Sequence, residues 1–135
     1  MAYFNWSDNL SVGVDVIDGQ HRYLIELIND LHGAMRDGKG REAVGEVLDR
    51  LVEYTVFHFK TEERLMKAYR YGHPVYHLHE HEKLISRIVE LQAQHKSGQA
   101  GVSTAALKFL KDWLYEHILK VDKRFAHFLN GQGVY

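Results

Sequence analysis

The sequence predicts an all-α protein, an up-down-up-down antiparallel four-helix bundle preceded by an extended N-terminal arm. Apolar residues recur at spacings of three and four in four segments, and no segment of any length alternates with the period of two typical of β-strands. Clusters of glycine and proline separate the four segments. The length of 135 residues suits one domain with a core, so we expect a single domain, with the arm over about residues 1–17 and the bundle over about residues 18–130.

The predicted arm contains large apolar side chains without helical spacing. They are Phe4, Trp6, Val12, Val14 and Ile17. We expect this segment to lie against the bundle and to cover part of its core.

The first predicted helix spans about residues 18–35, where Leu24, Ile28, Leu31 and Met35 share one face. Asp18 is a candidate N-cap because its short carboxylate can accept a hydrogen bond from a free backbone N–H. The second predicted helix spans about residues 41–71.

The apolar face of this second helix is interrupted by polar residues. Its stripe runs through Val44, Leu48, Leu51, Thr55, His58, Glu62, Leu65 and Tyr69. A histidine and a glutamate on a buried stripe cost free energy unless they are paired or bind a metal.

The third predicted helix spans about residues 74–95 and begins at Pro74, whose missing N–H costs nothing in a first turn. The fourth follows Ser103 or Thr104, either of which can cap it, and ends near Asn130-Gly131. Its inward stripe contains Leu107, Leu110, Leu114, His117, Val121, Phe125 and Phe128.

Composition excludes several classes of function. The 17 basic and 18 acidic side chains nearly cancel, so we expect no nucleic-acid partner. No run approaches the roughly 20 apolar residues that cross a bilayer, and the N-terminus does not resemble a leader, so we expect no membrane insertion and a cytoplasmic location. The chain has 10 histidines and no cysteine, so any metal must be held by nitrogen and oxygen.

Two helices present pairs of metal-ligating residues four positions apart. His58 and Glu62 lie on the second helix, and His77 and His81 lie on the third. Residues at this spacing are about 40° apart around the axis and one turn along it, so both side chains can reach one centre. A single pair is weak evidence of a metal site, but two pairs are much stronger.

The outer helices contribute three further candidates. His21 lies early in the first helix, and His117 and Asp122 lie in the fourth. The last two are about 140° apart on an ideal α-helix, too wide for one small ion, so a two-metal centre or a local π-bulge is needed. The up-down order places all seven residues at the same end of the bundle.

Five imidazoles and two carboxylates are too many ligands for one tetrahedral zinc and too rich in nitrogen for calcium or magnesium. Two transition-metal ions bridged by the two carboxylates fit the count.

These motifs resemble those of the hemerythrins, and especially the single-domain bacteriohemerythrins, over essentially the whole chain. The matching pieces are Trp6, Ser11-Val12-Gly13-Val14, Ile17-Asp18-x-Gln20-His21, His58-Phe59-x-x-Glu62-Glu63, His77-x-x-x-His81 and His117-x-x-x-x-Asp122.

The resemblance implies a non-haem di-iron centre that binds dioxygen reversibly. One iron takes His77, His81 and His117, and the other takes His21 and His58. Glu62 and Asp122 bridge the two ions, Fe2+ or Fe3+, together with an oxo or hydroxo group. The second iron then has one open coordination position for dioxygen.

Reversible binding requires that water be kept away from the open iron. The resemblance assigns this role to an apolar oxygen pocket made of Leu24, Phe59, Trp113, Leu114 and Ile118. By spacing alone each of these residues is equally well explained as bundle core.

The other histidines are expected outside the centre. We expect His73, His79 and His127 to be surface or structural residues, and His32 and His95 to lie on inner stripes but roughly 16 Å and 21 Å along the axis from the nearest ligand helix positions. Glu63, turned by about 100° from Glu62, is solvated or a partner of a ligand.

Three alternatives compete with an oxygen carrier. A ferritin-like di-iron redox enzyme would present Glu-x-x-His motifs, and the chain has none. A c-type haem needs Cys-x-x-Cys-His, and a b-type haem leaves most of the ligands unexplained. The third alternative is a sensor of oxygen or iron. A carrier, in turn, would have an unidentified oxygen-consuming enzyme as a partner for delivery. We predict storage, transport or delivery of dioxygen, without catalysis.

Overall fold

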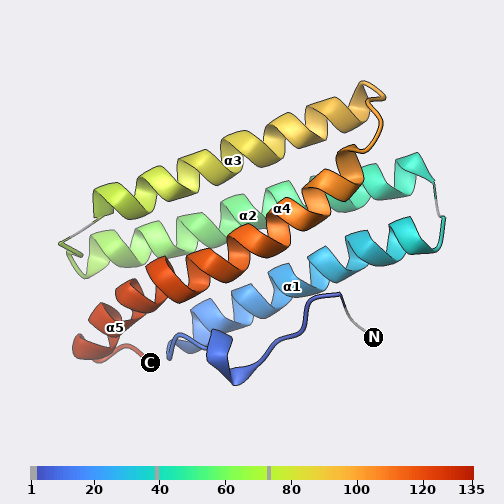
Figure 1. Ribbon diagram of the computed structural model, residues 1–135. Coiled ribbons are helices and arrows are strands. Elements are labelled where there is room, and N and C mark those ends of the chain that lie inside the picture. Colours follow the sequence, from blue (N-terminus) through green and yellow to red (C-terminus); the bar gives the residue numbers. More distant parts are fainter. Residues whose placement is uncertain (1–2, 39, 73) are drawn as a thin grey trace.

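The computed structural model describes residues 3–38, 40–72 and 74–135, and its described part is an antiparallel four-helix bundle (Figure 1). The helices are α1 (Asp15–Arg36), α2 (Arg41–Ala68), α3 (Pro74–Lys96) and α4 (Val102–His117). A π-helical turn, η2 (Ile118–Asp122), joins α4 to α5 (Lys123–Gly131), so that these three elements form the fourth rod of the bundle. The predicted fold class is confirmed.

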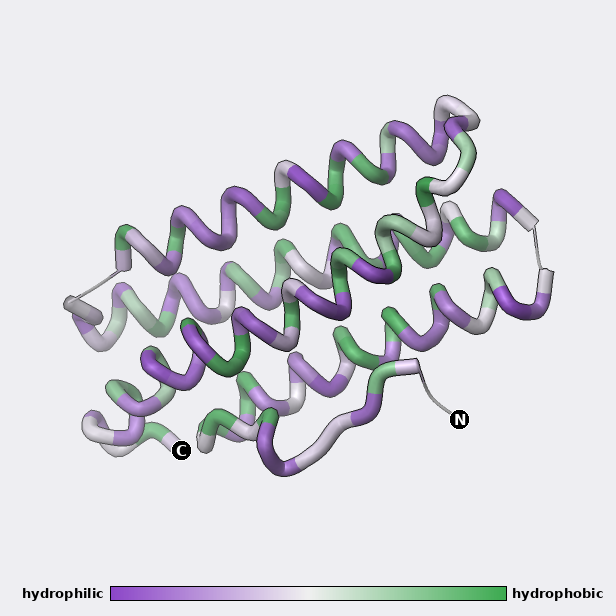
Figure 2. The backbone as a smooth tube through the Cα atoms, in the orientation of Figure 1, coloured by the Kyte–Doolittle hydropathy of each residue, from purple (hydrophilic) through white to green (hydrophobic). Residues whose placement is uncertain are grey.

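Each helix packs against two neighbours. α1 contacts α2 and α4, and α3 contacts α2 and α4, which closes the ring around one core. Apolar and polar residues alternate along each rod with helical period (Figure 2), as the spacing of apolar residues predicts. The largest fully buried side chains come from all four rods and from the arm, and include Leu10, Ile17, Leu48, Ile88 and Phe125.

Two predicted helix starts are wrong. α1 begins at Asp15 with Val14 as its N-cap, three residues before the predicted cap Asp18. The fourth rod begins at Val102 with Gly101 as its N-cap, before Ser103 and Thr104. Gly101 has φ +77°, a backbone conformation that favours glycine and lets the chain turn directly into the helix.

Residues 3–14 form the arm, which includes a short 3-10 turn, η1 (Asp8–Leu10), and lies along α1 (Figure 1). Asn29 holds its start, because the amide accepts from Phe4 N and donates to Phe4 O, both at 2.8 Å. The Asp18 carboxylate holds its end by accepting from Ser11 Oγ at 2.5 Å and from Val12 N at 2.8 Å. Asp18 therefore binds the arm and does not cap α1.

Among the residues that the structure describes, no helix combines the length and the apolar character that crossing a membrane requires.

Replacing Asp18 with alanine should detach the end of the arm. The buried Val12 N–H would lose its acceptor, so we expect a loss of about 1–3 kcal/mol in the free energy of unfolding, measured by urea denaturation. Asp15→Ala is the matched control, since Asp15 is an exposed acid in the same first turn. Equal losses of unfolding free energy in the two variants would contradict the role of Asp18 in holding the arm.

Candidate metal centre

All seven predicted ligands meet inside one end of the bundle. α1 contributes His21, α2 His58 and Glu62, α3 His77 and His81, and the fourth rod His117 and Asp122. Each is almost completely buried, with His117 the most exposed at 4%. The structure therefore brings together every residue that the motifs singled out for metal binding.

The π-helical turn solves the spacing problem of the fourth rod. On a regular α-helix His117 and Asp122 would diverge, but η2 follows His117 directly and ends at Asp122. His117 Nε2 lies 3.0 Å from Asp122 Oδ1 as a result. The sequence left open whether a π-bulge or the separation of two metals would reconcile the pair, and the structure has the π-turn.

The ligand atoms form two overlapping groups that share both carboxylates. One group holds His77, His81 and His117 with Glu62 and Asp122, and the other holds His21 and His58 with the same two acids. Within each group the candidate ligand atoms lie within 4.8 Å of one another. This division into three and two histidines is the one that the family resemblance implied.

The carboxylates lie between the imidazole rings. Asp122 has Oδ2 at 2.9 Å from His21 Nε2 and Oδ1 at 3.1 Å from His77 Nε2. Glu62 Oε1 lies 3.0 Å from His81 Nε2 and 3.6 Å from His58 Nε2. Each acid therefore faces histidines of both groups, which is the position of a bridging ligand.

The chemistry of the donor set fits metal ions. The Nε2 atoms of all five histidines and all four carboxylate oxygens are buried and have no hydrogen-bond partner of proper geometry among the described residues. Such unsatisfied groups are rare in a protein interior and require an explanation. Two ions with nitrogen and oxygen ligands would satisfy all of them.

Without metal ions, the neighbouring histidines balance the negative charge of the two carboxylates. Burial alone would raise the pKa of Glu62, and Asp122 would raise it further, but the neighbouring imidazoles lower it to about 2. Burial would raise the pKa of Asp122 as well, but the attraction of His117 and the close contacts with His21 and His77 hold it well below its usual range. Both acids are therefore charged.

The pKa values of the histidines shift in different directions. Burial lowers the pKa of His77, but its close contacts with the carboxylates of Asp122 and Glu62 outweigh burial and raise it to about 9. Burial dominates at His58 and lowers its pKa to about 4. The pKa of His21 is raised, since Asp122 outweighs burial. A proton on His77 thus offsets part of the carboxylate charge that metal ions would otherwise balance.

Two ligand rings are anchored on the side away from the cluster. His81 Nδ1 lies 3.1 Å from Glu63 Oε2, so Glu63 contacts a candidate ligand, which is one of the two roles expected for it. His58 Nδ1 lies 2.6 Å from Gln20 Oε1, and Gln20 Nε2 donates to Thr61 Oγ1 at 3.2 Å. The sequence predicts no role for Gln20 or Thr61. Two signals mark Gln20: it stands in the Ile17-Asp18-x-Gln20-His21 motif, and it is a polar residue four positions before Leu24 on the apolar stripe.

Two of the five predicted apolar residues lie against histidines of the centre. Phe59 stacks on His81 with ring centroids 3.6 Å apart, and Trp113 stacks on His117 at 4.2 Å. Leu24, Leu114 and Ile118 are buried, whereas Trp113 is half-buried. Whether these five side chains form an oxygen pocket stays a prediction.

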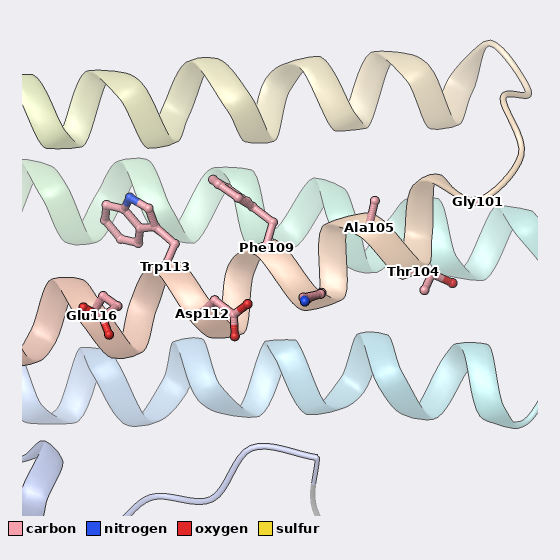
Figure 3. A pocket seen from close by; sticks show the side chains of 8 residues that line it. Gly101, Thr104, Ala105, Phe109, Asp112, Trp113 and Glu116 are labelled. Atoms are coloured by element: carbon pink, nitrogen blue, oxygen red, sulfur yellow. The ribbon is translucent and has the colours of Figure 1, made fainter.

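Trp113 also forms part of the surface. A shallow hollow of about 760 Å³ runs along α4, where Phe109 and Trp113 point the same way (Figure 3). A smaller hollow of about 150 Å³ is lined by Trp113 and His117 with Tyr76, Glu80, Glu116, Lys120 and Val121. The indole is therefore a thin wall between solvent and a candidate ligand.

The remaining histidines that the structure describes lie outside the centre, as predicted, although His32 and His95 are only half-buried and not part of the inner core. His32 stacks on Tyr3 at 4.8 Å, and His95 Nε2 lies 2.9 Å from the carbonyl oxygen of Arg41. His79 and His127 are exposed. His73 lies outside the described residues.

Comparisons with known proteins agree with this geometry. Residues 12–129 match the family described as Hemerythrin HHE cation binding domain. The chain is 40% identical over 126 residues to the bacteriohemerythrin of Stenotrophomonas maltophilia, covering 93% of this chain and 81% of that one. It is 35% identical over 127 residues to the bacteriohemerythrin of Methylococcus capsulatus, covering 93% and 96%. A crystal structure of wild-type hemerythrin superposes with a TM-score of 0.88 at 35% identity, covering 95% of this chain and 98% of that one.

Metal loading should release protons at neutral pH. His77, with its pKa near 9, is protonated at pH 7 in the metal-free chain, and it must lose that proton to bind a metal. Metal affinity should therefore rise with pH up to about 9. Above that pH, His77 should no longer release a proton when the metal binds. An indicator dye in weakly buffered solution measures the release during titration with zinc. No difference in proton release between pH 7 and pH 9.5 would contradict the protonation of His77.

Proposed function

Since this chain belongs to the hemerythrin family, we propose that it binds dioxygen reversibly at a non-haem di-iron centre. Its ligands would be His21, His58, Glu62, His77, His81, His117 and Asp122. Five imidazoles with two shared acids suit iron in its ferrous and ferric states, with an oxo or hydroxo bridge completing the centre.

The observation that carries the proposal is the unequal division of the histidines. The two groups share Glu62 and Asp122, but one contains three imidazoles and the other two. With identical bridges, the second ion would have one protein ligand fewer, which would leave one position for an exogenous molecule. The iron ions, when bound, supply the two electrons that reversible dioxygen binding requires.

The chain itself would protect this position. Phe59 places carbon next to His81 and His58, and Trp113 places it next to His117. Leu24, Leu114 and Ile118 are buried in the same core. Apolar walls exclude water and keep the nitrogen–metal interactions in a medium of low dielectric constant. Carrier function is favoured over oxygenase function because the donor set is rich in histidine and poor in carboxylate. Dioxygen would be stored, or delivered to an unidentified oxygen-consuming enzyme.

An absorption spectrum tests the proposal directly. Purified protein with two irons per chain should show visible bands in air that bleach under argon and return on readmission of air. A Soret band, or bands that never recover, would refute reversible binding at a di-iron site.

Removing one ligand should remove iron. His117→Ala should lower the iron content to one ion per chain or less, measured by elemental analysis, and should abolish the reversible bands. His127→Ala is the control, since His127 is exposed on the same rod. Full iron content in His117→Ala would contradict the ligand assignment.

Shortening a wall residue should shorten the life of the oxygenated protein. Leu114→Ala should keep its iron but lose reversible binding about tenfold faster, which corresponds to about 1.4 kcal/mol in the barrier. Leu107→Ala, an equally buried position about 10 Å further along α4, is the matched control. Repeated oxygenation cycles measure the rate, and equal rates in both variants would argue against a pocket at Leu114.

A further inference from the structure

The two halves of the centre are anchored by partners of different charge. The outer nitrogen of His81, in the three-histidine group, faces the Glu63 carboxylate at 3.1 Å. The outer nitrogen of His58, in the two-histidine group, faces the neutral amide of Gln20 at 2.6 Å. Neither partner is a candidate ligand.

The contact with Glu63 fixes the tautomer of His81. A carboxylate only accepts hydrogen bonds, so His81 Nδ1 must carry the proton and donate it. The lone pair of His81 is then on Nε2, which lies 3.0 Å from Glu62 Oε1 inside the cluster. Glu63 therefore turns His81 toward the metal position and places a negative charge behind its ring.

A longer chain of hydrogen bonds fixes the tautomer of His58. Thr61 Oγ1 donates its single proton to the carbonyl of Phe57 at 3.1 Å. Thr61 must therefore accept from Gln20, whose amide nitrogen lies 3.2 Å away, and this leaves the carbonyl oxygen of Gln20 facing His58. His58 Nδ1 donates to that oxygen, and its Nε2 lone pair faces the cluster.

Two other ligand rings have no such anchor. Nδ1 of His21 and Nδ1 of His77 are buried without a hydrogen-bond partner among the described residues. Aromatic packing holds His77 instead, since Phe125 meets its ring edge-on at 5.5 Å. His77 therefore provides an internal reference for His81 within the same three-histidine group.

We propose that Glu63 and Gln20 are positioning residues that make the two metal positions unequal. Glu63 is a charged partner of His81, whereas Gln20 is a neutral partner of His58. The inference rests on the ligand assignment of the proposed function. A carboxylate behind an imidazole raises its basicity as a ligand, and loss of such a partner typically costs 10–100-fold in metal affinity. The three-histidine position thus holds its ion more tightly and favours the higher oxidation state.

Zinc binding tests the proposal without iron or dioxygen. Glu63→Gln keeps an acceptor for His81 and removes the charge, so zinc affinity at the three-histidine position should fall about tenfold while the other position is unchanged. Competition with a chelating dye measures the two dissociation constants. The histidine ring signals in nitrogen-15 NMR show which position fills.

A reciprocal variant and a control complete the titration. Gln20→Glu puts a carboxylate behind His58 and should narrow the difference between the two constants. Glu53→Gln removes the same charge from an exposed position on α2 and should change neither constant. Equal weakening of both positions in Glu63→Gln, or no weakening, would overturn the proposal.

The NMR spectra of the zinc-loaded protein give a readout that a merely structural role would not move. The Nδ1 proton of His81 should resonate further downfield than that of His77 and shift upfield in Glu63→Gln. Coincident signals in the unmodified protein would also overturn the proposal.

Iron-loaded protein separates this inference from the proposed function. If the unmodified protein binds dioxygen reversibly and Glu63→Gln has the same midpoint reduction potential, the inference fails and the function stands. If the zinc results are as expected and no reversible bands form, the function fails and the inference stands. When both hold, the midpoint potential of Glu63→Gln is higher than that of the unmodified protein.

Discussion

The constraint on which the rest of this structure depends is the burial of two charged carboxylates in one end of a helical bundle. Glu62 and Asp122 are completely buried and still charged, because imidazoles surround them on every helix. An uncompensated buried charge costs several kcal/mol, so the helices must stay where their histidines reach the acids. The positions of α1 to α4 at this end are thus set by electrostatics as well as by apolar packing.

The same constraint explains the irregular fourth rod. A continuous α-helix would have turned Asp122 away from the other ligands and left Glu62 as the only shared acid. The π-turn widens one turn of backbone and brings Asp122 within 3.1 Å of both His77 and His117. Beyond it, Phe125 packs between His77 and Tyr71, so the helix resumes on a buried aromatic contact. Local departures from ideal geometry such as this π-turn are often found at functional sites.

The sequence predicted the bundle and most of the cluster because both are periodic features. His58 and Glu62 interrupt an apolar stripe, and His77 and His81 repeat their spacing of four, so no tertiary information is needed to mark them. Asp122 lies outside this period, about 140° from His117 on an ideal helix, and the hemerythrin-like motif is what supports it. Helix starts were harder to predict from the sequence. Asp18 resembles an N-cap, but its carboxylate accepts a hydrogen bond from Val12 N, and this contact depends on how the arm folds back against α1. The contact of Gln20 with His58 crosses from α1 to α2, so its role follows only from the packing of these helices.

The proposed reversible binding of dioxygen would make two opposite demands on this site. The ions would have to stay bound, which requires basic and well-oriented imidazoles, and solvent would have to stay out, which requires carbon around them. Glu63 and Trp113 meet these demands separately: the half-exposed Glu63 side chain contacts the ring of His81, and the indole of Trp113 covers the ring of His117. Because the charge of Glu63 comes from the surface side of His81, the contacts next to the cluster can remain apolar. One end of the bundle could thus combine a charged partner for a candidate ligand with aromatic cover for another.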